Sequence, residues 1–175
     1  PGGRLTSANA VSPEGPPPPA ASAVVSRDAD GRVTVRATRL PEPIVLDGRL
    51  DENIYTTTPA ITDFIQQEPH EGQPATQKTE AWVFFDDRNV YVSFRCWLTE
   101  PDRLVANEMR RDDSNIWWND NVAVSLDTFF DHRNGIFFQT NALGGVREGA
   151  ASDERNVNYD YNTVWDVKSR RFDRG

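Results

Sequence analysis

Residues 79–98 constrain the fold more than any other part of the sequence, because apolar residues alternate with other types on both sides of the polar run 86–89. Successive side chains of a β-strand point to opposite faces, so this pattern predicts a β-hairpin. Pairing outward from the polar loop sets three cross-strand pairs: Phe85 with Val90, Trp82 with Ser93, and Glu80 with Arg95.

The two faces of this hairpin differ in character. One is apolar and is predicted to lie in the core, and it carries Ala81, Val83, Phe85, Val90, Val92, Phe94 and Cys96. The other is rich in aromatic residues, and a surface of that kind needs a cover, either another layer of the same chain or a partner. The predicted partner-binding residues on it are Trp82, Phe84, Tyr91 and Trp97.

The rest of the chain also favours strands. Alternation predicts a first strand over residues 32–38, and the Asn134-Gly135 turn predicts a second hairpin over residues 121–141, with Val122, Val124 and Leu126 facing inward. Residues 50–55 are expected to form a short helical turn, residues 150–161 a loop, and residues 164–167 the start of another strand. Together these segments predict an all-β fold, an antiparallel, jelly-roll-like β-sandwich.

Composition limits the class of protein. A chain of 175 residues and 19.7 kDa has the length of one domain. Its net charge of -8 and pI near 4.8 exclude a nucleic-acid binder, which needs clustered Lys and Arg. No stretch approaches the roughly 20 apolar residues of a membrane span. The single cysteine, Cys96, is predicted to be a buried, inert thiol.

The N-terminal 30 residues differ from the remainder. They are rich in Pro, Ala and Ser, and such a composition buries too little apolar area to offset its chain entropy. We expect a disordered or extended arm over residues 1–30, held by a partner surface, and a folded domain over residues 31–175. The partner-binding residues predicted in the arm are Pro16, Pro17, Pro18 and Pro19.

Trp117 and Trp118 are the best candidates for ligand contact. An indole ring can stack on the apolar C–H face of a sugar while polar neighbours bind its hydroxyl groups. The predicted glycan-binding residues are Trp117, Trp118, Asn115, Asn119 and Asp120. The alternative is that one tryptophan fills the end of the sandwich and the other covers its rim.

Two oxygen-rich loops suggest structural calcium, which prefers carboxylate, amide and carbonyl ligands. The first candidate set is Asp127, Asp131 and Asn134, and the second is Asp112, Asp113 and Asn115. Neither has EF-hand spacing, so solvated turn residues are the alternative. Catalysis has little support, because the only histidines, His70 and His132, lie outside any catalytic signature. We expect no enzyme activity.

Two motifs carry a family resemblance. The first comprises residues 44–52 (Ile-Val-Leu-Asp-Gly-Arg-Leu-Asp-Glu) with Phe64, Gln66, Pro69, Gly72, Pro74, Ala75 and Thr79. The second comprises residues 120–129 with Asp131, residues 133–135 and residues 141–144. Over residues 44–165 the chain resembles the family 9-like carbohydrate-binding modules, with Tyr55 where the family usually has Trp.

The resemblance implies a β-sandwich that binds rather than catalyses, followed in many members by a membrane-type barrel. It also implies export, so the expected location is extracytoplasmic, periplasmic or secreted, with a cleaved signal before Pro1. Members normally add a closing strand, so the sandwich is expected to lack its last strand or strands.

Two functions remain open. The first is a non-enzymatic interaction domain, docked through its Pro-rich arm and open sheet edge on other subunits of a larger membrane-associated assembly, for example an electron-transfer complex. The second is a secreted carbohydrate-binding module that recognises a glycan by tryptophan stacking.

Overall fold

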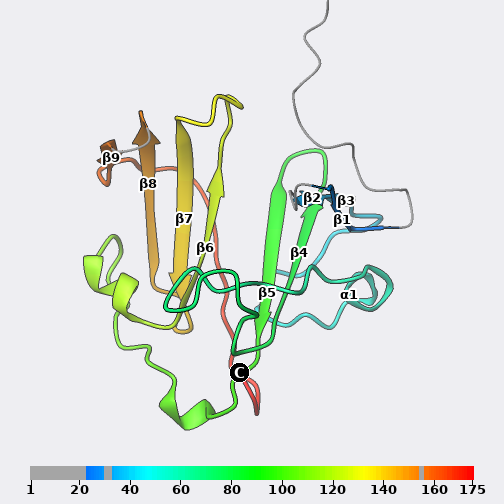
Figure 1. Ribbon diagram of the computed structural model, residues 1–175. Helices are drawn as coiled ribbons and strands as arrows, with labels where there is room; N and C mark the ends of the chain where they lie inside the picture. Colours follow the sequence, from blue (N-terminus) through cyan, green and yellow to red (C-terminus); the bar gives the residue numbers. More distant parts are fainter. Residues whose placement is uncertain (1–22, 30–32, 154–155) are drawn as a thin grey trace, which may run out of the picture.

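The computed structural model describes residues 23–29, 33–153 and 156–175. Its strands form three sheets, and its helices are short (Figure 1). The two-stranded sheet pairs β1 (Val25–Arg27) with β2 (Val33–Val35), and the three-stranded sheet has the order β3 (Thr38–Arg39), β4 (Thr79–Phe85), β5 (Val90–Cys96). The four-stranded sheet has the order β6 (Asn121–Leu126), β7 (Gly135–Asn141), β8 (Val146–Ser152), β9 (Asn156–Asn158).

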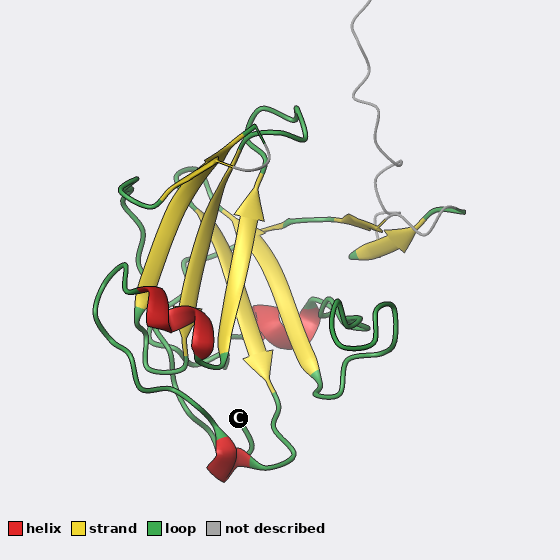
Figure 2. Ribbon diagram, turned by 60° about the vertical axis from the view of Figure 1, so that its left-hand side comes forward, coloured by secondary structure: helices red, strands yellow, loops and turns green. Residues whose placement is uncertain are grey.

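The fold is therefore all-β, as predicted, and the two larger sheets form a sandwich-like arrangement (Figure 2). All strand pairs are antiparallel except β3 with β4. The helices described are α1 (Asn53–Thr57) and two 3-10 helices, η1 (Pro101–Arg103) and η2 (Ser114–Trp118). The helical turn expected over residues 50–55 thus forms slightly later in the chain.

The first hairpin has the predicted register, with Phe85 opposite Val90 and Trp82 opposite Ser93. The prediction of which face is better buried was wrong. Trp82 and Phe84, expected to meet a partner, are only 3% and 0% exposed. They are covered by this chain itself, so neither can contact a partner in this fold.

The cover comes from α1 and from Leu40. The ring of Tyr55 in α1 makes edge contacts with both Trp82 and Phe84, at 5.3 Å between centroids in each case. Its hydroxyl group lies 2.8 Å from Oγ of Ser93 on β5. Contacts of this geometry stabilise by about 0.5–1.5 kcal/mol each beyond the buried area. This aromatic cluster fixes α1 on the outer face of the three-stranded sheet.

On the other face Ala81 is buried, as predicted, at 4% exposed, but the remaining residues of that face are less buried. On the face predicted to be core, Val83, Phe85, Val92, Phe94 and Cys96 are half-buried and Val90 is exposed. Burial raises the pKa of the Cys96 thiol, which agrees with an unreactive cysteine.

The two remaining aromatic residues predicted to bind a partner are half-buried and have contacts within the chain. The Tyr91 hydroxyl group donates to Oδ2 of Asp86 over 2.7 Å. Trp97 makes an edge contact with the ring of Phe172, at 5.0 Å between centroids.

The second hairpin is confirmed, with Asn121 opposite Asn141 and Leu126 opposite Ile136. Val122 and Val124 are half-buried, but Leu126 is exposed and does not face a closed core. The loop expected over residues 150–161 was wrong in part, because β8 and β9 lie within residues 146–158.

Residues 161–168 do not form the predicted strand, although they keep a strand-like alternation. Tyr161, Thr163, Trp165 and Val167 are half-buried, whereas the residues between them are exposed. The Trp165 ring contacts Phe138 of β7 at 5.2 Å between centroids. Within the described part of the chain, residues 161–170 make no backbone–backbone hydrogen bond.

At the N-terminal end, β1 lies inside the region predicted to be an arm, so folded structure begins before residue 31. β2 agrees with the first predicted strand, although it is shorter. Pro16, Pro17, Pro18 and Pro19 lie outside the described residues.

Two turns from the family-like motifs meet at Ser169. Gly48 and Gly144 both have a φ of +82°, a conformation that favours glycine. A Cβ atom on Gly48 would lie 3.0 Å from the carbonyl carbon of Ser169, and one on Gly144 would lie 3.3 Å from its Oγ. The segment that follows the last strand is therefore packed against both turns.

Candidate binding surface around Trp117 and Trp118

Trp117 and Trp118 lie on η2, a single short 3-10 helix. The Asp113 side chain caps its start by accepting from the backbone N–H of Asn115 over 2.8 Å. Residues of a 3-10 helix project about 120° apart. Ile116 is completely buried, while Trp117 is 62% and Trp118 is 77% exposed. Ile116 therefore anchors the helix, and the alternative that a tryptophan fills the sandwich end was wrong.

Neither indole takes part in the aromatic or cation–π contacts of the described residues. Their directions differ because they are neighbours on a three-residue turn. The pair therefore offers two separate apolar surfaces rather than one continuous plane.

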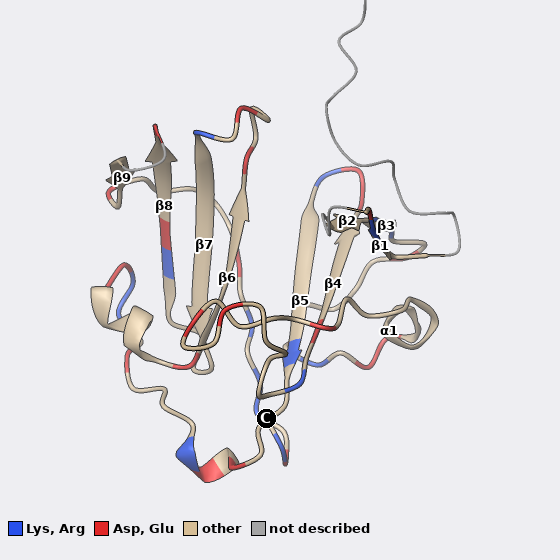
Figure 3. Cartoon of the chain, in the orientation of Figure 1, with Lys and Arg blue, Asp and Glu red and all other residues tan. Residues whose placement is uncertain are grey.

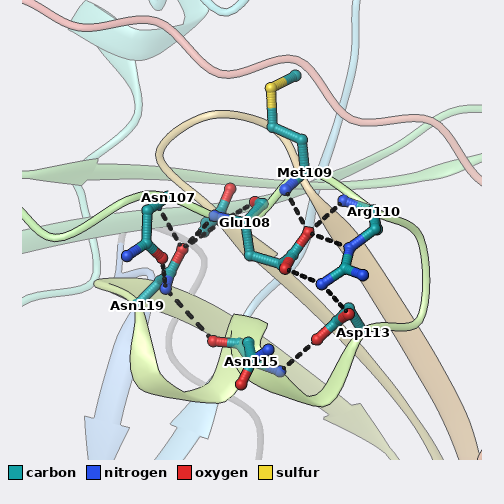
Figure 4. Close-up of polar contacts among 8 residues, drawn as sticks. Asn107, Glu108, Met109, Arg110, Asp113, Asn115 and Asn119 are labelled. Atoms are coloured by element: carbon teal, nitrogen blue, oxygen red, sulfur yellow. Dashed lines mark hydrogen bonds and ion pairs between the residues drawn. The ribbon is translucent and has the colours of Figure 1, made fainter.

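Asn119, directly after η2, fixes the position of this helix (Figure 4). Its Oδ1 accepts from the backbone N–H groups of Asn107 and Glu108 and from Nδ2 of Asn141, at 2.9, 3.1 and 2.8 Å. Its Nδ2 donates to Oδ1 of Asn107 and to the carbonyl oxygen of Asn115. Asn119 is buried, so the prediction that it contacts a ligand was wrong. Its hydrogen bonds hold η2 in position instead.

Glu108 forms the second part of this support (Figure 4). Its Oε1 accepts from the backbone N–H groups of Met109 and Arg110, and its Oε2 lies 2.8 Å from Nη2 of Arg110. The same Nη2 lies 2.7 Å from Oδ2 of Asp113. The side-chain hydrogen bond from Arg110 is the main cause that lowers the pKa of Glu108 to about 2. Nothing in the sequence singled out Glu108, Arg110 or Asn141 for this role.

Asn115 and Asp120, the other predicted contact residues, are both exposed next to the tryptophans. The Oδ2 atom of Asp120 accepts from the backbone N–H of Val105 over 2.7 Å, which orients the carboxylate. These two side chains remain available to bind hydroxyl groups.

A second arginine joins the preceding turn to β8. Arg111 pairs with the carboxylate of Glu148, which is completely buried, and its Nε lies 3.4 Å from Oδ2 of Asp112. Asp112 has a φ of +60°, and its backbone N–H donates to the carbonyl oxygen of Val146. Figure 3 shows basic and acidic residues in the turn that precedes η2 and on β8.

In the first loop suggested for calcium, between β6 and β7, the carboxylates of Asp127 and Asp131 accept hydrogen bonds from the loop itself. Asp127 accepts from the backbone N–H groups of Phe129, Asp131 and His132, which lower its pKa, the last of them most. Asp131 accepts from the side chain and backbone of Asn134 and from the backbone N–H of Arg133. Asp127 and Asp131 are thus exposed turn residues, in agreement with the alternative expected from the sequence.

The second suggested set, Asp112, Asp113 and Asn115, lies in the turn and helix described above. Asp112 pairs with Arg111, and Asp113 pairs with Arg110. The backbone N–H of Asn115 donates to the Asp113 side chain at the start of η2. No group of three His, Cys, Asp or Glu side chains with metal-site geometry occurs among the residues described. Calcium stays a prediction.

The histidines and one hollow among the described residues lie away from η2 in the sequence. His132 is in the β6–β7 loop, where its ring contacts Phe130, and His70 is exposed in the loop before β4. The hollow, about 240 Å³, is lined by residues of β1 and of the segment 59–63. It holds one carboxylate, Asp63, and one guanidinium group, Arg27.

Among the described residues, no helix is long and apolar enough to cross a membrane. Comparison of the chain with protein-family models, with curated proteins and with solved structures finds no match. The resemblance to the family 9-like carbohydrate-binding modules therefore stays a prediction from the sequence motifs.

Proposed function

We propose that this chain is a non-catalytic, extracytoplasmic binding domain that recognises carbohydrate through Trp117 and Trp118. The observation that carries the proposal is that η2 exposes two indole rings, while Ile116 on the same helix is buried and anchors it. Apolar rings of this size are rarely left exposed together without a binding role.

The support beneath the rings favours binding. Asn119 donates to the carbonyl oxygen of Asn115 in η2, and Arg110 joins Glu108 to the N-cap Asp113, so little backbone freedom is lost when a ligand binds. Each ring can stack on the C–H face of a pyranose, and the exposed side chains of Asn115 and Asp120, close to the rings in the sequence, can hydrogen-bond hydroxyl groups.

Titration calorimetry with a panel of neutral oligosaccharides tests the proposal. Trp117→Ala and Trp118→Ala should each weaken binding by about ten-fold, because each removes one stacking surface. Phe129→Ala is the matched control, since Phe129 is as exposed as Trp118 but lies on the β6–β7 loop. Binding that is unaffected by both tryptophan changes, or absent for every oligosaccharide, contradicts the proposal.

A second candidate is docking on other subunits of a membrane-associated assembly through a sheet edge. It is supported by β5 and β6, which are terminal strands of their sheets, and by residues 161–170, which make no backbone–backbone hydrogen bond to any other described residue. In the view of Figure 1 this segment passes between β6 and β5. An extended backbone without partners can accept an added strand.

Val164 gives a direct test of the second candidate, because its side chain is fully exposed and its change to proline removes one backbone N–H. Native-size chromatography of the tagged full chain from cell extracts should show co-eluting subunits for the wild type and fewer for Val164→Pro. Val164→Thr, which keeps the N–H, should behave as the wild type. Identical elution of the three forms counts against docking at this segment.

A further inference from the structure

We infer that the Trp117–Trp118 surface selects positively charged amino sugars over neutral sugars and excludes acidic ones. This inference rests on the proposed function and names the ligand class at the same surface. It depends on the charges that surround η2 and on which of them are already paired.

The two arginines near the tryptophans in the sequence form ion pairs with carboxylates. Arg110 bridges Glu108 and Asp113, at 2.8 and 2.7 Å, and Arg111 bridges Asp112 and Glu148. A ligand carboxylate or sulfate would meet guanidinium groups whose positive charge is already balanced by carboxylates. An anionic sugar therefore meets no unpaired arginine in this turn.

The carboxylates outnumber the arginines. Among the ion pairs of the described residues, Glu108 and Asp113 pair with Arg110, Asp112 and Glu148 pair with Arg111, and Asp120 has no pair, so five carboxylates stand against two guanidinium groups. Asp120 is exposed and accepts only a backbone N–H among its described contacts. Asp113 is the N-cap of η2 and Asp120 follows Trp118 by two residues, so the field of these two carboxylates acts on a ligand at η2 over the screening length of about 8 Å at physiological salt.

The indole rings also attract positively charged groups, as the carboxylates do. The face of a tryptophan ring attracts a cation, and neither ring has a cation over it in the described structure. A protonated amino group on a stacked pyranose would be attracted both by the ring face and by the carboxylates near η2. The exposed carboxylate of Asp120 and the free faces of the two indole rings therefore favour one class of ligand, a pyranose that carries an ammonium group.

Four probes of equal length distinguish the possibilities by calorimetry near pH 5.5, where both sugar amines and carboxylates are charged. They are the hexamers of glucosamine, N-acetylglucosamine and galacturonic acid, and hexalysine. We expect the glucosamine hexamer to bind about three- to ten-fold more tightly than its acetylated form, and the preference to shrink in 0.5 M salt. The galacturonate hexamer should bind most weakly of the three sugars.

Asp112→Asn and Asp120→Asn should each reduce the preference for the amine without abolishing binding of the neutral hexamer. Asparagine keeps an acceptor for Val105 at position 120 and tolerates the positive φ at position 112. Asp87→Asn removes the same charge from the exposed β4–β5 turn and should change nothing.

The outcomes separate the two proposals. Equal binding of the amine and acetylated hexamers, or tighter binding of galacturonate, overturns the charge selection and leaves carbohydrate binding intact. Tryptophan-dependent binding of hexalysine without any sugar overturns both and indicates a basic peptide as the ligand. Binding of none of the probes also overturns both.

Discussion

The side-chain amide of Asn141 donates to Oδ1 of Asn119 over 2.8 Å and joins the end of β7 to the end of η2. Asn141 is itself buried, and its Oδ1 accepts from the backbone N–H groups of Leu143 and Gly145. One asparagine pair therefore connects the β7–β8 turn with the helix that carries the tryptophans.

Removing Asn119 should loosen this helix. Asn119→Ala leaves the backbone N–H groups of Asn107 and Glu108 without an acceptor, so the free energy of unfolding should fall by about 2–4 kcal/mol. Asn115→Ala, which removes an exposed side chain, should change it by less than about 0.5 kcal/mol. Urea titration of both variants measures the difference, and equal stabilities would contradict the supporting role of Asn119.

Glu108 should make stability depend on acid pH. Its pKa in the folded state, about 2, lies below the value of about 4.3 for an unfolded glutamate. A lowered pKa stabilises the fold above the unfolded value, and this stabilisation is lost as the pH falls from about 4.3 towards 2. Glu108→Gln should therefore have a lower Tm at neutral pH and a shallower fall in acid.

Thermal melts at a series of pH values measure this effect. Glu71→Gln, a change at an exposed loop glutamate, is the control and should follow the wild type. The acid dependence will not vanish in Glu108→Gln, because hydrogen bonds from Arg88 and Tyr91 also lower the pKa of Asp86 to about 2. Parallel curves for Glu108→Gln and the wild type would refute the role of Glu108.

Tyr55 allows the hydrogen bond and the ring to be measured separately. Tyr55→Phe removes only the bond to Ser93 and should cost about 1 kcal/mol. Tyr55→Ala also removes the ring that covers Trp82 and Phe84, and should cost about 3–5 kcal/mol. If chemical denaturation gives the same loss for both variants, the ring does not act as the cover described.

The glycine turns offer a graded series. Gly48→Ala combines a positive φ with a close approach to the backbone of Ser169, and should cost about 2–4 kcal/mol. Gly72→Ala has a φ of +77° but open space around the new Cβ, so only the strain of about 1 kcal/mol remains. Gly144→Ala should lie between them. Equal losses at Gly48 and Gly72 would show that contact with Ser169 is unimportant.

The local alternation of apolar and polar residues predicted the first hairpin well. The register of β4 and β5 followed from alternation about a polar loop, because the loop fixes which residues pair. The better-buried face could not be predicted, because it depends on α1 and Leu40, which come from elsewhere in the chain. Tyr55 and Leu40 are part of the cluster that buries Trp82 and Phe84.

Strand β8 gave no sequence signal. Arg147, Glu148, Gly149 and Ala150 have weak strand preference and no apolar alternation, and pairing with β7 determines their conformation. At the candidate surface the exposed tryptophans were identified, but a supporting asparagine looks the same in sequence as a ligand-binding one. The burial of Asn119 depends on contacts with Asn107 and Asn141, which are remote in the sequence.

The packing of Ser169 against Gly48 and Gly144 has a consequence for biosynthesis. Both turns leave the ribosome before the residue that fits against them, so the nascent chain holds them without their shared contact until the segment after β9 emerges. We expect an early polypeptide ending before this segment to be a protease-sensitive intermediate, with maturation occurring late in translation.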